Sequence, residues 1–201
     1  GIIAVLIALS FKAGAVPFHQ WSPDVYEGAP TTVTAFMSVG PKAASLSALG
    51  TVLYGAFGAD PEVWVNTLIF IAIATMAIGN ILALRQDNLK RLLAYSSIAH
   101  VGYMMLGLLA QSQEGLSAIV VYMFIYAFMN IGAFAVVLSL KGGEDIDGYR
   151  GLSRTSPFIA LCMLILLFSL AGIPPFAGFI AKFRVFMAAV HAGYTLSLIH
   201  I

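Results

Sequence analysis

Long stretches without a charged residue constrain this chain more than any other feature. Residues 63–84 form one such stretch of 22 residues. As an α-helix it would rise about 33 Å, which matches the hydrocarbon core of a bilayer. Only 9% of all residues are charged and the mean hydropathy is +0.94, whereas a soluble domain carries roughly a quarter charged residues. We therefore expect an all-α integral membrane protein.

Similar apolar stretches recur along the chain, separated by short polar segments that are rich in turn-forming residues. The pattern predicts a polytopic bundle of about six transmembrane helices in a single transmembrane domain. Their predicted ranges are 1–20, 32–57, 63–84, 91–112, 116–140 and 156–190. The chain lacks an initiator methionine, and residues 197–201 have no loop or capping character. We interpret it as a fragment of a larger protein whose final residues need not be native.

The charges of the predicted loops indicate an orientation. The first, third and fifth loops lie on one side of the membrane, and the second and fourth lie on the other. All six of the following basic residues fall in the third and fifth loops, and none falls in the second or fourth: Arg85, Lys90, Arg91, Lys141, Arg150 and Arg154. By the positive-inside rule the basic side faces the cytoplasm. We expect a multi-pass protein, in a bacterial inner (plasma) membrane.

Lysines interrupt two of the predicted spans. Lys42 lies eleven residues after Thr31 and fifteen before Phe57, so neither interface is within reach of its side chain. Pro41 makes the local backbone irregular, a feature that usually lines protein or water. Lys12 either extends to the interface, helped by a kink at Pro17, or lines a hydrated internal path. Intramembrane charges are costly and usually face a cavity, so we expect both lysines to carry protons.

Two further ionisable residues leave two interpretations open. The segment 172–178 contains Pro174 and Pro175 between glycines, and it predicts a discontinuous helix. Such a break could leave Lys182 inside the membrane, although its distance from the start of the span also fits the far interface. His100 lies in the fourth span beside several hydroxyl groups. It is either a hydrogen-bonded packing residue or part of a proton relay.

Carboxylates are missing from the predicted spans, since all nine fall in predicted loops. Buried cations without partners are costly, so we expect acidic partners from missing segments or from neighbouring subunits. The single Cys162 excludes a disulfide framework and any multi-cysteine metal site. The sequence contains no glycine-rich phosphate loop, no Cys or His metal spacing and no nucleophile elbow, and we expect no nucleic-acid partner.

Several segments resemble the antiporter-like membrane subunits of NADH:quinone oxidoreductase, respiratory complex I. The resemblance covers essentially residues 1–190. It is carried by FKAGAVPFHQW at 11–21, PDVYEGAP at 23–30, TAFMSVGPK at 34–42, NLKRLLAYSSIAHVGY at 88–103 and GIPPFAGFIAKF at 172–183.

This resemblance implies helices seven to twelve of a fourteen-helix fold, in which helices seven and twelve are discontinuous. It implies a proton path through Lys12, Lys42 and Lys182, with an acidic partner on an earlier helix outside the chain. The resemblance also implies other membrane subunits as partners. NADH, FMN, iron–sulfur clusters and quinone would be bound elsewhere in the complex, and none of them by this chain.

Two alternatives remain open on the sequence. A cation/proton antiporter or a membrane-bound hydrogenase uses subunits built on the same scaffold. A purely structural membrane subunit would use its lysines only to pair with neighbours.

Overall fold

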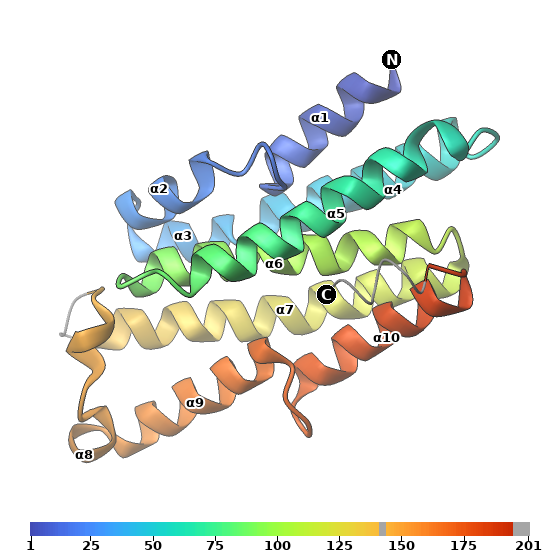
Figure 1. Ribbon diagram of the computed structural model, residues 1–201. Helices are drawn as coiled ribbons and strands as arrows, with labels where there is room; N and C mark the ends of the chain where they lie inside the picture. Colours follow the sequence, from blue (N-terminus) through green and yellow to red (C-terminus); the bar gives the residue numbers. More distant parts are fainter. Residues whose placement is uncertain (141–143, 195–201) are drawn as a thin grey trace.

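The computed structural model describes residues 1–140 and 144–194, and within them the regular structure is helical. Lys141 and the final residues 197–201, on which the sequence analysis commented, lie outside the described residues. The elements are α1 (Ile2–Ala13), α2 (Trp21–Gly28), α3 (Thr31–Met37), α4 (Gly40–Ala56), α5 (Glu62–Ala83), α6 (Leu89–Leu109), α7 (Gln113–Ser139), the 3₁₀ helix η1 (Ile146–Tyr149), α8 (Leu152–Thr155), α9 (Pro157–Ala171) and α10 (Ala177–His191). The long helices run side by side as a bundle (Figure 1). The all-α membrane fold with discontinuous helices is confirmed.

Within residues 1–140 and 144–194, three helices are long and apolar enough to cross a membrane without interruption, namely α5, α6 and α7. They correspond to the predicted spans 63–84, 91–112 and 116–140. Each of the other three predicted ranges is interrupted: 1–20, 32–57 and 156–190.

The predicted helix 1–20 is wrong in its second half, because α1 ends at Ala13. Gly14 has a φ of +78° and turns the backbone into the left-handed region, which glycine adopts without steric cost. The chain then runs without helix past Pro17 to α2. The break leaves the amide of Val16 without a helical partner, and this amide donates a 3.0 Å hydrogen bond to Oγ1 of Thr75 on α5. A partner helix therefore satisfies the interrupted backbone.

The predicted helix 32–57 is likewise two helices, since α3 ends at Met37 and α4 begins at Gly40. Pro41 has no amide hydrogen and its ring clashes with the carbonyl four residues earlier, so a continuous helix through this point is disfavoured. Pro41 instead lies in the first turn of α4, where a proline is tolerated.

The break between α9 and α10 contains Pro174 and Pro175, where the sequence predicted one. Gly172 closes α9 with a φ of +84°. The backbone amide of Gly178 in the first turn of α10 donates to Oγ of Ser169 over 3.0 Å. A serine of the first half-helix thus caps the second.

The first predicted loop contains a helix that the sequence analysis missed. Residues 22–30 were expected as loop, and with them the carboxylates Asp24 and Glu27, but both lie in α2. Pro23 sits in the first turn of α2, where it costs no helical hydrogen bond. Both carboxylates are paired with Arg91 of α6, each at 2.7 Å. Tertiary contacts therefore hold a segment that looked like a turn.

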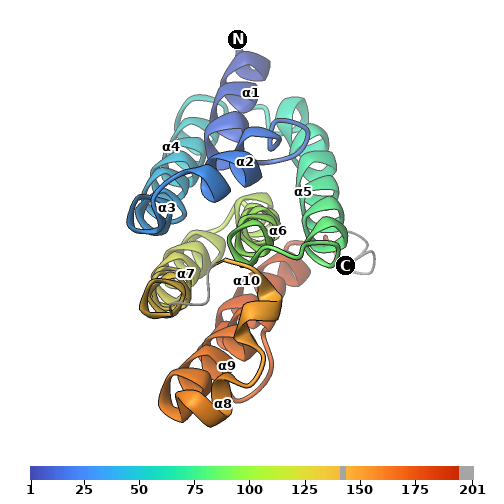
Figure 2. The ribbon, with the colours of Figure 1, turned by 90° about the vertical axis from the view of Figure 1, so that its left-hand side faces the viewer.

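Helix α6 lies in the middle of the bundle, surrounded by the other long helices (Figure 2). Of the apolar 18-residue stretch of α6, 83% is buried, whereas the corresponding share is 39% for α5 and 44% for α7. The connections α1–α3, α5–α6 and α7–α9 gather at one end of the bundle, the left end in Figure 1. This arrangement is the one assumed when the orientation was inferred from the loop charges.

Candidate functional site

Lys42 is buried at the start of α4, with 2% of its surface exposed. Its ammonium nitrogen, Nζ, donates a 2.6 Å hydrogen bond to Oγ of Ser97 on α6. The ring centroid of Tyr26 on α2 lies 5.8 Å from the same nitrogen, in a cation–π contact. Three helices therefore hold one intramembrane amine.

The end of α1 provides a further electrostatic partner for Lys42. A Cβ atom placed on Gly14 would lie 3.8 Å from the Lys42 Nζ, so the amine approaches the carboxyl-terminal end of α1. Helix carboxyl ends carry partial negative charge and favour cations. The break in α1 brings this end into the middle of the bundle, where it can stabilise the amine without a carboxylate.

Helix α6 carries a stripe of polar groups that continues from Ser97. His100 and Tyr103 follow Ser97 at intervals of three residues, so the three side chains lie along one side of the helix. The ring of Tyr126, on α7, lies 5.0 Å from the ring of His100. This stripe leads from Lys42 toward Lys182 on α10. We call the stripe and the two lysines the polar row.

His100 is 2% exposed, and its Nδ1 shares a hydrogen bond of 2.7 Å with the hydroxyl of Tyr122. Its ring also packs edge-on against Tyr103 at 5.9 Å. The hydroxyl of Tyr126 makes no hydrogen bond within the described residues, although it is buried. A neutral imidazole donates at one ring nitrogen and accepts at the other, so His100 can pass a proton between its neighbours.

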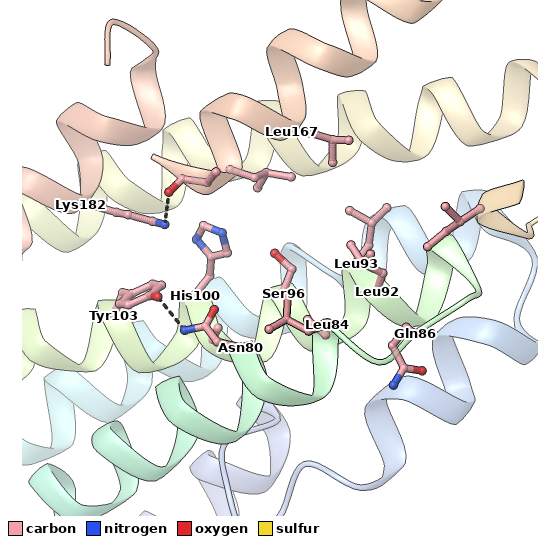
Figure 3. Close-up of a pocket in the computed structure, with 15 residues that line it drawn as sticks. Asn80, Leu84, Gln86, Leu92, Leu93, Ser96, His100, Tyr103, Leu167 and Lys182 are labelled. Atoms are coloured by element: carbon pink, nitrogen blue, oxygen red, sulfur yellow. Dashed lines mark hydrogen bonds between the residues drawn. The ribbon is translucent and has the colours of Figure 1, made fainter. Parts of the chain in front are cut away.

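Lys182, on α10, reaches back over the break and donates to the carbonyl oxygen of Ala171 at the end of α9, over 3.0 Å. Its amine also lies 4.8 Å from the ring centroid of Tyr103. Lys182 and His100 point toward one another across the space between α6 and α10 (Figure 3). Like Lys42, Lys182 holds its amine at the carboxyl end of a half-helix.

Two cavities meet at Lys182. A cavity of about 760 Å³ is lined by Gln86 and Ile146 at the basic-loop end of the bundle and reaches His100 and Lys182 (Figure 3). A smaller cavity of about 290 Å³ is also lined by Tyr103 and Lys182, together with Phe183 and Phe186 of α10. Lys182 therefore lines both cavities.

Lys12 does not join this cluster. It lies exposed in the last turn of α1 and makes no hydrogen bond or ion pair within residues 1–140 and 144–194. The structure thus brings together three of the four predicted proton-carrying residues, Lys42, His100 and Lys182, and leaves Lys12 on the surface of the bundle.

Carboxylates take no part in the polar row among the described residues. The ion pairs of the described chain are Lys90–Glu144, Arg91–Asp24, Arg91–Glu27, Arg150–Asp147 and His191–Glu114. Hydroxyl groups, an aromatic face and helix ends surround the amines instead. The described residues also contain no group of three His, Cys, Asp or Glu side chains that could hold a metal ion.

The sequence analysis missed several members of the row. Ser97 was noted only as one of the hydroxyls near His100, and Tyr26 was assigned to a loop. Tyr122 and Tyr126 lie in the long apolar helix α7, and tyrosines in membrane helices are usually packing residues. Their spacing of four residues, on one face of α7, was the available signal.

Interrupted membrane helices whose breaks lie beside buried lysines define a polytopic, antiporter-like membrane protein. The chain belongs to the family described as NADH:quinone oxidoreductase/Mrp antiporter, TM, whose family model matches residues 1–201. This finding confirms the family that the sequence motifs indicated, and with it an integral membrane location.

Named relatives refine this likeness. NADH-quinone oxidoreductase subunit N of Paramagnetospirillum magneticum is 52% identical over 204 residues, which cover 99% of this chain and 42% of that protein. Within the family, the sequence PDVYEGAPT at 23–31 and Lys182 in GFIAKF look most like this subunit. The chain spans less than half the length of this curated relative.

Solved structures share the fold. A chain of respiratory complex I from Thermus thermophilus, solved with bound aureothin, matches with 40% identity and a TM-score of 0.82, over 97% of this chain and 44% of that chain. A chain of the Mrp complex from Dietzia sp. DQ12-45-1b matches with 28% identity and a TM-score of 0.90, over 99% of this chain and 38% of that one. The identities favour complex I over the antiporter scaffold.

Proposed function

We propose that this chain is part of a proton-translocating membrane subunit of an NADH:quinone oxidoreductase. Protons would move along the row Lys42–Ser97–His100–Lys182, driven by electron transfer in other subunits. The observation that carries the proposal is that Lys42 on α4 and Lys182 on α10 both contact the same polar side of α6. Lys42 binds Ser97, and Lys182 lies over the ring of Tyr103, which packs against His100. Partner subunits would hold the NADH, FMN, iron–sulfur clusters and quinone.

The chemistry of the row suits proton transfer. Each lysine amine is held by a neutral acceptor and by a helix end. No carboxylate of the described residues therefore fixes either amine in its protonated state. Hydroxyl groups and an imidazole both donate and accept hydrogen bonds, and they can pass a proton along a chain. Water in the cavity of about 760 Å³ would supply protons from the end of the bundle that bears the basic loops.

Lys12 would take part through a residue of the larger protein. It is exposed in this chain, and an unpaired cation at this depth in lipid is costly. We propose that a segment outside this chain covers Lys12 with an acidic group and extends the row beyond Lys42.

The test is Lys42→Met in the full-length protein within the intact complex. In closed vesicles we expect NADH oxidation and complex assembly to persist while the number of protons moved per electron falls. A normal ratio in a fully assembled complex would overturn the proposal. Loss of assembly with a normal ratio in the residual complex would support a purely structural subunit instead. Dependence of transport on Na⁺ in place of electron flow would favour the antiporter alternative.

A further inference from the structure

Two adjacent cations at the start of α6 reach across to α2. Lys90 is 2% exposed, and its Nζ donates to the carbonyl oxygens of Glu27 and Ala29, each over 2.8 Å. It also donates to Oε1 of Glu144 over 2.7 Å. An ammonium group has three hydrogens, so these three acceptors satisfy it completely. Lys90 was predicted to lie in the third loop, and it is instead a buried, fully bonded residue in the first turn of α6.

Arg91 also binds α2. Its Nη1 donates to Oδ1 of Asp24 and to Oε2 of Glu27, each over 2.7 Å. The side chain of Asn88 accepts from the backbone amides of Lys90 and Arg91 and so fixes the first turn of α6. We call Lys90 and Arg91, with their partners on the 24–29 segment, the α6–α2 clasp.

Helix α2 depends on such contacts because it has little stability of its own. It has eight residues and no side-chain cap, and it follows the non-helical segment 14–20. Helices this short are not stable in isolation. The ammonium of Lys90 neutralises carbonyl groups at the carboxyl end of α2, where a cation is favoured. The clasp therefore contributes to the position of α2, together with the hydrogen bonds of Trp21 and Tyr26 to α1 and α3.

Tyr26 is the residue through which the clasp reaches the polar row. It is fully buried, and it immediately precedes Glu27, whose carbonyl Lys90 binds. Its ring lies 5.8 Å from the Lys42 amine, and its hydroxyl donates to the carbonyl of Met37, just before the break between α3 and α4. A shift of α2 would therefore move this ring away from Lys42.

We propose that Lys90 is a positioning residue for Lys42: through the α6–α2 clasp it holds the Tyr26 ring against the Lys42 amine. The effect on pumping rests on the proposed function, whereas the effect on α2 does not. Glu144 completes the bonding of Lys90 from the segment after α7. The carbonyl oxygen of Glu144 also accepts from the amide of Leu89. The clasp is thus fixed from both sides of α6.

The experiment uses the intact complex with full-length protein carrying Lys90→Met. Hydrogen exchange of the α2 amides gives a readout that does not depend on pumping. We expect exchange at 21–28 to accelerate by about tenfold or more, since local opening becomes easier. The matched control is Arg150→Met, which removes an exposed ion pair with Asp147 near the same end. It should leave α2 exchange unchanged. Unchanged α2 exchange in Lys90→Met would overturn the inference, whatever happens to pumping.

A double-mutant cycle tests the functional part. Lys90→Met and Tyr26→Leu should each lower the number of protons moved per electron. The double variant should have the same ratio as Tyr26→Leu alone. Lys90→Arg, which keeps the charge and the donors, should restore part of the rate. Additive losses would overturn the route through Tyr26.

Two controls distinguish failure of the positioning role of Lys90 from failure of the proposed function. If Lys90→Met leaves the protein poorly assembled, Glu144→Gln weakens the same bond set with a smaller change and should show the same pattern. If Lys42→Met does not alter pumping, the proposed function fails, and α2 exchange still decides whether Lys90 positions α2.

Discussion

The ammonium group of Lys42 on α4 lies 2.6 Å from the hydroxyl of Ser97 on α6. Ser97 donates its own hydrogen to the carbonyl of Ala94 over 2.8 Å, so a lone pair of its oxygen faces the amine. This bond ties the buried Lys42 to the central helix of the bundle. It is also the first step from Lys42 toward His100.

Ser97→Ala should weaken the hold on the Lys42 amine. A hydrogen bond to a charged group contributes about 1.5–3 kcal/mol, and its loss leaves a buried donor without a fixed partner. We expect fewer protons moved per electron in closed vesicles, with electron transfer retained. Ser45→Ala is the matched control, because Ser45 is equally buried on α4 but donates to the carbonyl of Pro41. Equal effects of the two variants would contradict a specific role for Ser97.

Tyr122→Phe should destabilise the fold more than Tyr126→Phe. The Tyr122 hydroxyl is bonded to Nδ1 of His100, whereas the Tyr126 hydroxyl has no hydrogen-bond partner within the described residues. Leaving the buried imidazole nitrogen unpaired costs about 1–3 kcal/mol. Thermal unfolding of the purified complex, followed through this subunit, measures the difference. A larger loss in Tyr126→Phe would contradict the assigned hydrogen bond.

Gly172→Ala should act both on stability and on Lys182. The φ of +84° costs a residue with a Cβ about 1–2 kcal/mol, and that Cβ would lie 2.9 Å from Cδ of Lys182. The lysine must then move from the carbonyl of Ala171. Gly151→Ala has a similar φ of +77° but open space around its Cβ. We expect both variants to lose stability and only Gly172→Ala to slow proton movement. Slowing in both would assign the effect to strain alone.

Much of the fold followed from length and hydropathy, because a bilayer demands about twenty apolar residues for each helix. That requirement placed α5, α6 and α7 within a few residues of their observed ends. The depth of Lys42 followed from the same counting. The break at Pro174 and Pro175 followed from the chemistry of proline, which cannot continue a helical hydrogen-bond ladder.

The remaining features depend on contacts between segments far apart in the chain. Lys90 and Arg91 bind helix α2 from a distant part of the chain, and the local helix propensity of residues 21–28 contains no such information. Lys90 itself read as a loop charge, since its acceptors come from residues 27, 29 and 144. The row of tyrosines around His100 could not be distinguished from ordinary packing. Tertiary pairing, rather than local sequence, determines these parts of the site.

The proton-to-electron ratio of the intact complex carrying Lys42→Met, Lys182→Met or both tests the central claim most directly. If the two lysines lie on one path, each single variant removes the contribution of this subunit, and the double variant has the same ratio as either single variant. A double variant that loses about twice as much, or single variants with a normal ratio, would contradict a single path through Lys42 and Lys182.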